Sequence, residues 1–151
     1  MIALSTAYLV NTLKSGKELV TEGTNLGFSA FELNIEISQK MVEEIAKILS
    51  ERKIKIVSLH NFCPKLDFIP AGRDLLTAYQ FSSTDPEERK KAIEFTKRTV
   101  DYATDLDAQA VVIHAGEVEI ELNEGELFSQ FICKKRGNHL IGADYLEQVK
   151  K

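Results

Sequence analysis

Two histidines each close an apolar run, at the position where a parallel strand would end. His60 ends the run at residues 54–60, and His114 ends the run at residues 110–114. In a parallel α/β sheet or barrel, all strands point their carboxyl ends toward one face, where the connecting loops and helix N-termini gather. We therefore expect the two imidazoles side by side at one mouth. One such histidine alone is equally well explained as an isolated polar residue, but two equivalent placements favour a site.

A carboxylate joins this set of candidate catalytic residues. Glu32 lies in an apolar segment at residues 28–34, which predicts another strand of the same sheet. Imidazole and carboxylate groups facing one cavity suit a divalent metal such as Zn²⁺, Mn²⁺ or Mg²⁺. They equally suit proton transfer next to a carbonyl, the central step of aldose–ketose isomerisation and of epimerisation. For Glu32 the plainer alternative, an ion pair with a neighbouring cation, stays open.

Residues in the loop after His60 are candidates for substrate contact. Asn61 and Cys63 follow the histidine closely, and Arg73 lies further along a long connection at residues 61–84. Long loops inside compact domains usually carry function or move. We predict that these three residues bind substrate, with Arg73 reaching a phosphate or sugar. The alternatives are loop packing for Cys63 and an ordinary surface position for Arg73.

The elements that must position these residues alternate between strand and helix. Strands are predicted at residues 1–5, 28–34, 54–60 and 110–114, and helices at residues 13–26, 39–52 and 86–106. Ser38 and Asp85 are predicted N-caps, Glu88 completes a capping box, and Gly27 ends the first helix in a left-handed conformation. The predicted buried positions of the third helix are Ala92, Ile93, Thr96, Val100 and Ala103. In the first helix, Leu19, Val20, Gly23 and Leu26 are predicted to share one face.

This order of elements predicts an α/β fold of about four parallel βα units with right-handed crossovers. A complete eight-unit barrel takes roughly 250 residues, whereas this chain has 151. The prediction is a single domain over residues 1–151, either a four-stranded open sheet or a half or truncated TIM-type barrel. Residues 117–126 are acidic and loop-like, residues 127–132 suggest a helical turn or two, and residues 144–151 suggest the start of another helix.

The composition of the chain limits the kinds of partner that it is expected to bind. The net charge is -4, and no dense basic patch stands out, which argues against nucleic acid as a partner. The two cysteines, Cys63 and Cys133, have no metal-binding or disulfide-framework spacing. Neither a signal peptide nor a membrane span is evident, so we expect a cytoplasmic protein. The third histidine, His139, lies in a polar connection and is expected to be solvated.

Four segments in this order resemble the N-terminal half of the xylose isomerase-like TIM-barrel superfamily. They are residues 27–33, 57–60, 83–92 and 110–116, with sequences GFSAFEL, VSLH, STDPEERKKA and AVVIHAG. The superfamily includes sugar and sugar-phosphate isomerases and epimerases, and the endonuclease IV type of DNA repair enzyme. The resemblance covers most of residues 1–116 and weakens afterwards.

The resemblance implies that Glu32, His60 and His114 project into a barrel mouth. In the nuclease branch, the two histidines would be metal ligands. In the isomerase and epimerase branch they more often contact the substrate, and later strands hold the metal. The leading hypothesis is thus a metal-dependent isomerase or epimerase of a small sugar, sugar phosphate or polyol. The alternatives are the nuclease branch and a non-catalytic binding or assembly unit. A half-barrel leaves open sheet edges, and part of the apolar runs that contain Val57, Leu59, Val111 and Ile113 would face the missing half. We therefore also expect a homo-oligomer.

Overall fold

The computed structural model of this chain describes residues 2–116. The chain divides into two units, Met1–Gly116 and Glu117–Lys151, and only the first is described. Cys133, His139 and the elements predicted after residue 116 lie outside the described residues. The prediction of one domain over the whole chain therefore stays a prediction.

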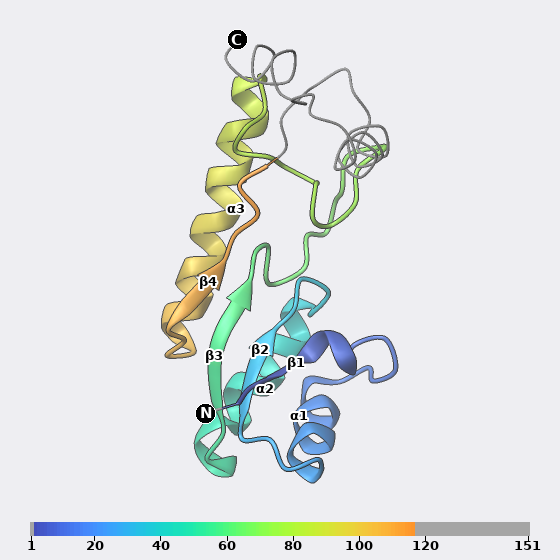
Figure 1. The fold of residues 1–151 in the computed structure, drawn as a ribbon, viewed down its shortest axis with the longest axis vertical. Helices are drawn as coiled ribbons and strands as arrows, with labels where there is room; N and C mark the ends of the chain where they lie inside the picture. Colours follow the sequence, from blue (N-terminus) through green and yellow to red (C-terminus); the bar gives the residue numbers. More distant parts are fainter. Residues whose placement is uncertain (1, 117–151) are drawn as a thin grey trace, which may run out of the picture. The chain divides into compact units, whose positions relative to one another are not determined.

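The described residues form a parallel α/β sheet, as predicted. The four strands lie in the order β1-β2-β3-β4, and each pairs in parallel with the next (Figure 1). The elements are β1 (Leu4–Ser5), the 3-10 helix η1 (Thr6–Tyr8), α1 (Gly16–Asn25), β2 (Ala30–Leu33), α2 (Gln39–Arg52), β3 (Lys55–His60), α3 (Pro86–Asp105) and β4 (Ala110–Val112). β4 ends two residues earlier than predicted, so His114 follows the strand instead of closing it. Sequential strand order with helical crossovers is the arrangement of consecutive units of a TIM-type barrel.

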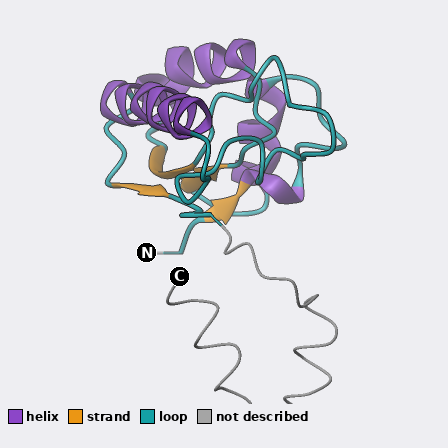
Figure 2. Cartoon of the chain, turned by 90° about the horizontal axis from the view of Figure 1, so that it is seen from above, coloured by secondary structure: helices purple, strands orange, loops and turns teal. Residues whose placement is uncertain are grey.

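The helices cover one face of the sheet (Figure 2). Phe31 and Leu33 of β2 are completely buried on this face, where they pack with apolar residues of all three α-helices. Since successive strand residues point to opposite faces, Glu32 between them points to the other face. The same strand therefore supplies core residues on one side and a carboxylate on the other.

One extra residue in β3 changes which of its side chains face the helices. Phe31 pairs with Ile56, but the next residue of β2, Glu32, pairs with Ser58, so Val57 has no partner in the register. Without the extra residue, Ile56 and Leu59 would point to opposite faces. With it, both lie in the helix-covered core. Part of this apolar run is predicted from the sequence to face the missing half, and Leu59 is not in that part. The irregularity that turns it toward the helices has no signal in the periodicity of the segment.

The helix ends follow the predicted capping residues, with one correction. Ser38 Oγ accepts a hydrogen bond from the Met41 N–H, and an Asp85 carboxylate oxygen accepts from the Glu87 N–H. Gly27 has a positive φ of 93°, as expected for the residue that ends a helix in the left-handed region. Glu88, however, does not complete a capping box. Its carboxylate accepts hydrogen bonds from residues of the preceding loop.

The predicted buried faces of α1 and α3 were partly wrong. Ile93 and Val100 of α3 are 47% and 46% exposed, whereas Thr99 between them is completely buried. In α1, Leu26 is 53% exposed although Leu19 is completely buried. The buried face of α3 is narrower and more polar than its apolar spacing suggests, because threonine hydroxyls on it bond to the loop that follows β3.

That long loop packs on α3 through its own apolar cluster. The cluster consists of Phe62, Leu66, Ala78, Tyr79 and Ala92, with Ile69, Phe81 and Phe95 against it. Within residues 2–116, no helix has the length and apolar character needed to cross a membrane.

Candidate functional site

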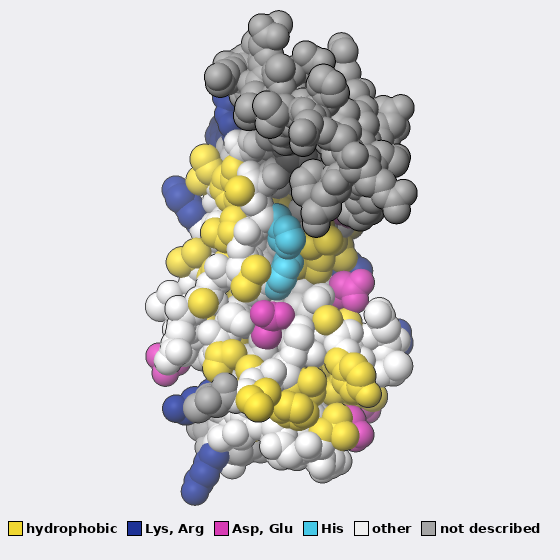
Figure 3. Space-filling view, viewed as in Figure 1, with side chains coloured by type: hydrophobic (Ala, Val, Ile, Leu, Met, Phe, Trp, Pro, Cys, Tyr) yellow, Lys and Arg dark blue, Asp and Glu magenta, His cyan; other side chains and the backbone are white. Residues whose placement is uncertain are grey.

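The two histidines meet at the carboxyl end of the sheet. His60 is the last residue of β3, and His114 lies two residues beyond β4. Their Nε2 atoms are 3.1 Å apart, and their ring centroids are 4.9 Å apart. The pair forms a continuous patch on the surface of the described residues (Figure 3). The expected proximity of the two side chains is confirmed.

The surroundings of His60 favour a neutral ring. Burial and the neighbouring His114 lower the pKa of His60 below its ordinary value of 6.5, against weaker opposing contributions from the Asn61 backbone and Glu32. Two imidazolium groups in contact would repel each other. A neutral imidazole has one ring nitrogen without a proton, which can accept a proton or bind a metal.

Glu32 lies on the same face of the sheet, one row below His60. Its two carboxylate oxygens accept hydrogen bonds from Ser5 Oγ of β1 at 2.9 Å and from Ser58 Oγ of β3 at 3.2 Å. The three residues are register partners across three adjacent strands. The two hydroxyls fix the carboxylate, and its negative charge favours the protonated form of the His60 ring. The alternative expectation, an ion pair with a cation, is not what these contacts show.

The residues present fit part of a metal site. Two imidazole nitrogens that bind one Zn²⁺ at about 2.0–2.1 Å with a tetrahedral angle are roughly 3.3 Å apart, close to the observed 3.1 Å. Among residues 2–116, however, no three His, Cys, Asp or Glu side chains converge as a metal would require. The histidine pair could supply two ligands of a metal centre, which is fewer than a complete site needs.

Asn61 and Cys63, predicted to contact substrate, are both buried beside α3. Asn61 Nδ2 donates to Thr96 Oγ1, and the Cys63 backbone N–H donates to Thr99 Oγ1. Cys63 is completely buried, and burial raises the pKa of its thiol to about 12. This agrees with the alternative of a packing residue, and direct contact between this thiol and a substrate would need the loop to open.

Arg73 is held within the loop. Its guanidinium lies 3.4 Å from the Glu88 carboxylate and donates to the Thr77 carbonyl. Among the described residues its polar partners are these two, and neither belongs to the histidine pair. The structure therefore brings together Glu32, His60 and His114, but not Arg73.

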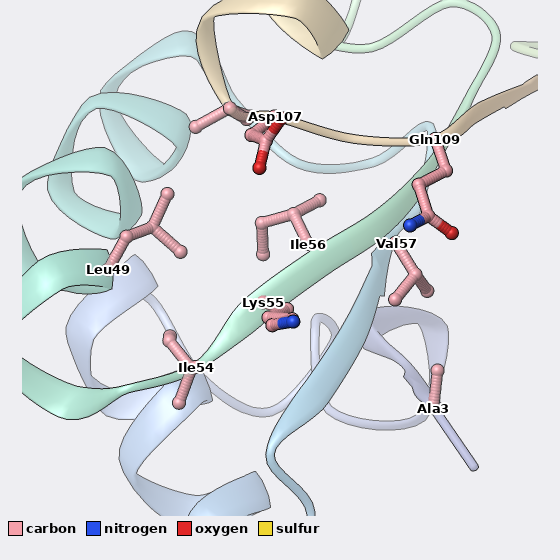
Figure 4. A pocket seen from close by; sticks show the side chains of 9 residues that line it. Ala3, Leu49, Ile54, Lys55, Ile56, Val57, Asp107 and Gln109 are labelled. Carbon is pink, nitrogen blue, oxygen red and sulfur yellow. The ribbon is translucent and has the colours of Figure 1, made fainter. Parts of the chain in front are cut away.

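A pocket of about 610 Å³ lies at the opposite end of the sheet. Apolar residues Leu49, Ile54 and Ile56 line it around the start of β3, together with the exposed Lys55 and Asp107 (Figure 4). Catalytic sites of parallel α/β folds lie at the carboxyl ends of the strands. We therefore place the candidate site at the histidine pair and not in this pocket.

Several residues of the site were not singled out from the sequence. Ser58 precedes His60 by two residues, and strand periodicity could have placed it on the same face. Ser5 could have been found only by knowing the register of β1 against β2. Thr96 was assigned to the core, and its bond to Asn61 has no local signal in the sequence.

Comparison with known proteins relates the chain to a family. A family model described as xylose isomerase-like TIM barrel matches residues 21–133, more than half of the chain. The match includes Glu32, His60 and His114. No curated protein matches this chain significantly.

Proposed function

Because the chain belongs to the xylose isomerase-like TIM barrel family, we propose that it is part of a metal-dependent isomerase or epimerase that acts on a sugar, a sugar phosphate or a small polyol. In this proposal the four βα units are the first half of an eight-unit barrel, and the histidine pair lies at its mouth. The observation that carries the proposal is the 3.1 Å contact between the Nε2 atoms of His60 and His114, above a fixed carboxylate.

The described residues are suited to moving a proton next to a carbonyl. A neutral imidazole accepts a proton when its pKa lies near or below the working pH, and the lowered pKa of His60 meets this condition. After transfer, the Glu32 charge would stabilise the imidazolium. The neighbouring His114, in contact with the same Nε2 atom, would help to hold the ring in place.

A divalent metal, when bound, would polarise the substrate carbonyl and make the adjacent C–H more acidic. His60 and His114 are the described residues that could hold it. Two ligands suit a shared centre and not a complete one, so the proposal leaves the remaining ligands unassigned.

The test follows solvent deuterium. The full chain, with Zn²⁺, Mn²⁺ or Mg²⁺, is incubated in D₂O with a panel of ketoses, aldoses and their phosphates, and NMR detects deuterium at the carbon next to the carbonyl. We expect incorporation with at least one substrate, and loss of it in His60→Ala and His114→Ala. Exchange that persists in both variants would reject the assignment.

The nuclease branch is the second candidate, because a shared metal on the two histidines is what that branch implies. Against it, the net charge is -4, and the Lys and Arg side chains of the described residues that are visible in Figure 3 lie toward the edges of the face that carries the histidines. Cleavage of a duplex oligonucleotide with one abasic site, without any deuterium exchange, would favour this candidate.

A further inference from the structure

His60 has one defined tautomer because of its contact with the next residue. Its Nδ1 lies 3.3 Å from the backbone carbonyl oxygen of Asn61. A carbonyl oxygen only accepts hydrogen bonds, so Nδ1 carries the proton and Nε2 has the free lone pair. In the pair, His114 Nε2–H then donates to His60 Nε2.

Asn61 is held in place from two sides. Its backbone N–H donates to the Val112 carbonyl at 2.9 Å, and its side-chain Nδ2 donates to Thr96 Oγ1 at 2.8 Å. The residue is 5% exposed, and its Oδ1 has no hydrogen-bond partner among the described residues. The bond to Thr96 is therefore the contact that anchors this buried amide.

The Thr96 hydroxyl can only accept a hydrogen bond from the Asn61 side chain, and cannot donate one to it. Its own hydroxyl proton is donated to the Ala92 carbonyl at 2.7 Å, which leaves the oxygen lone pair for an incoming donor. The amide must then present Nδ2 and not Oδ1. α3 thus sets the orientation of Asn61 through a single hydroxyl.

We propose that Thr96 is a positioning residue that fixes the tautomer and ring orientation of His60 through Asn61, and so presents Nε2 to a metal ion. Groups that hold the second nitrogen of a metal-binding histidine typically change metal affinity by roughly 10–100-fold when they are removed. The inference rests on the proposed function for its metal, but the tautomer it assigns exists without one.

α3 offers a matched control. Thr99 also donates its hydroxyl to a helix carbonyl, that of Phe95, and accepts from the loop after β3, at the Cys63 N–H. Thr99 is more deeply buried than Thr96, and its bond is to the Cys63 backbone and not to Asn61, the residue that contacts His60. Thr99→Val therefore removes a similar structural bond without touching the connection to His60.

The experiment measures the ring ¹⁵N shifts of His60 in the metal-free full chain, at about pH 8, where histidine is neutral. We expect a single Nδ1–H tautomer in the wild type, in Thr96→Ser and in Thr99→Val, and a mixture in Thr96→Val. If Thr96→Val does not fold, Asn61→Ala removes the same anchor and should give the same mixture. An unchanged tautomer in these variants, or an equal change in Thr99→Val, overturns the proposal.

Co²⁺ titration, followed by its visible absorption, separates this inference from the proposed function. We expect Thr96→Val to weaken Co²⁺ binding roughly tenfold, with Thr96→Ser and Thr99→Val close to the wild type. A tautomer change without any Co²⁺ binding to the wild type would support the positioning role and reject the metal. Co²⁺ binding that is equal in wild type and Thr96→Val would reject the positioning role and leave the metal in place.

Discussion

The two faces of the sheet are built on different principles although they share the same strands. The helix-covered face of β2 and β3 carries Phe31, Leu33, Ile56 and Leu59, all nearly or completely buried. The opposite face of these strands carries Glu32, Ser58 and His60, which are half-buried and bond to one another or to residues in or next to the neighbouring strands.

One face of the sheet therefore contributes mainly to the stability of the fold, and the other carries the polar groups of the candidate site. On the covered face, stability comes from apolar area removed from water, which has no direction and tolerates little loss of volume. On the other face, each polar group is fixed by a directional bond to a specific partner. β4 departs from this division, since its exposed Val112 adds an apolar side chain to the face that is polar on β2 and β3.

The largest change in the free energy of unfolding should come from a cavity on the helix-covered face of the sheet. Leu59→Ala removes a completely buried side chain, and we expect the free energy of unfolding to fall by about 2–5 kcal/mol. Ser58→Ala, one residue away on the other face, should cost only about 1 kcal/mol, since Glu32 keeps its bond to Ser5. Urea denaturation of both variants measures the contrast, and similar losses would contradict the division.

The histidine variants test the other face. His60→Ala and His114→Ala should each lower the affinity for Zn²⁺ by at least roughly 10–100-fold, with little change in unfolding. His139→Ala, outside the described residues, is the control. Metal analysis of the purified chains decides the point, because equal metal content in all three variants would leave substrate contact as the role of the pair.

A smaller effect is expected from pH. Because the pKa of His60 is lowered in the folded chain, the unfolded chain binds the proton first as pH falls below about 6.5. The free energy of unfolding should therefore decrease with falling pH from there to the folded pKa, and stay constant in this contribution above pH 6.5. The change should be small, since solvent screens the half-buried ring. Comparing His60→Gln with the wild type by thermal unfolding across pH 5–8 should show a weaker slope in the variant.

Substitutions at the end of β4 should change the stability of the fold least, but they should clearly change the oligomeric state. Val112 and Ile113 are 39% and 47% exposed at the end of an edge strand, and exposed apolar edges favour association. We expect the wild-type chain to sediment as an oligomer at micromolar concentration, and Val112→Lys with Ile113→Lys to shift it toward monomer without loss of stability. A monodisperse 17.0 kDa species for the wild type would contradict this expectation.

Much of the fold followed from local patterns. Strand and helix order, the caps at Ser38 and Asp85, and the meeting of His60 with His114 all depend on residues close in sequence and on the shared direction of parallel strands. The exposure of Ile93 and the partners of Glu88 depend on how the long loop lies on α3. The serine bonds to Glu32 depend on register. Neither kind of information is present in the periodicity of one segment.

Val57, which has no register partner in β2, affects how β3 tolerates mutation. Substitution at position 57 alters one half-buried side chain, whereas deletion of the codon would rotate one half of β3 against the other. Either Ile56 would leave the core, or Ser58 and His60 would turn toward the helices and away from Glu32 and His114. In a library that contains both kinds of variant, β3 should therefore accept many replacements of Val57 and no deletion of it.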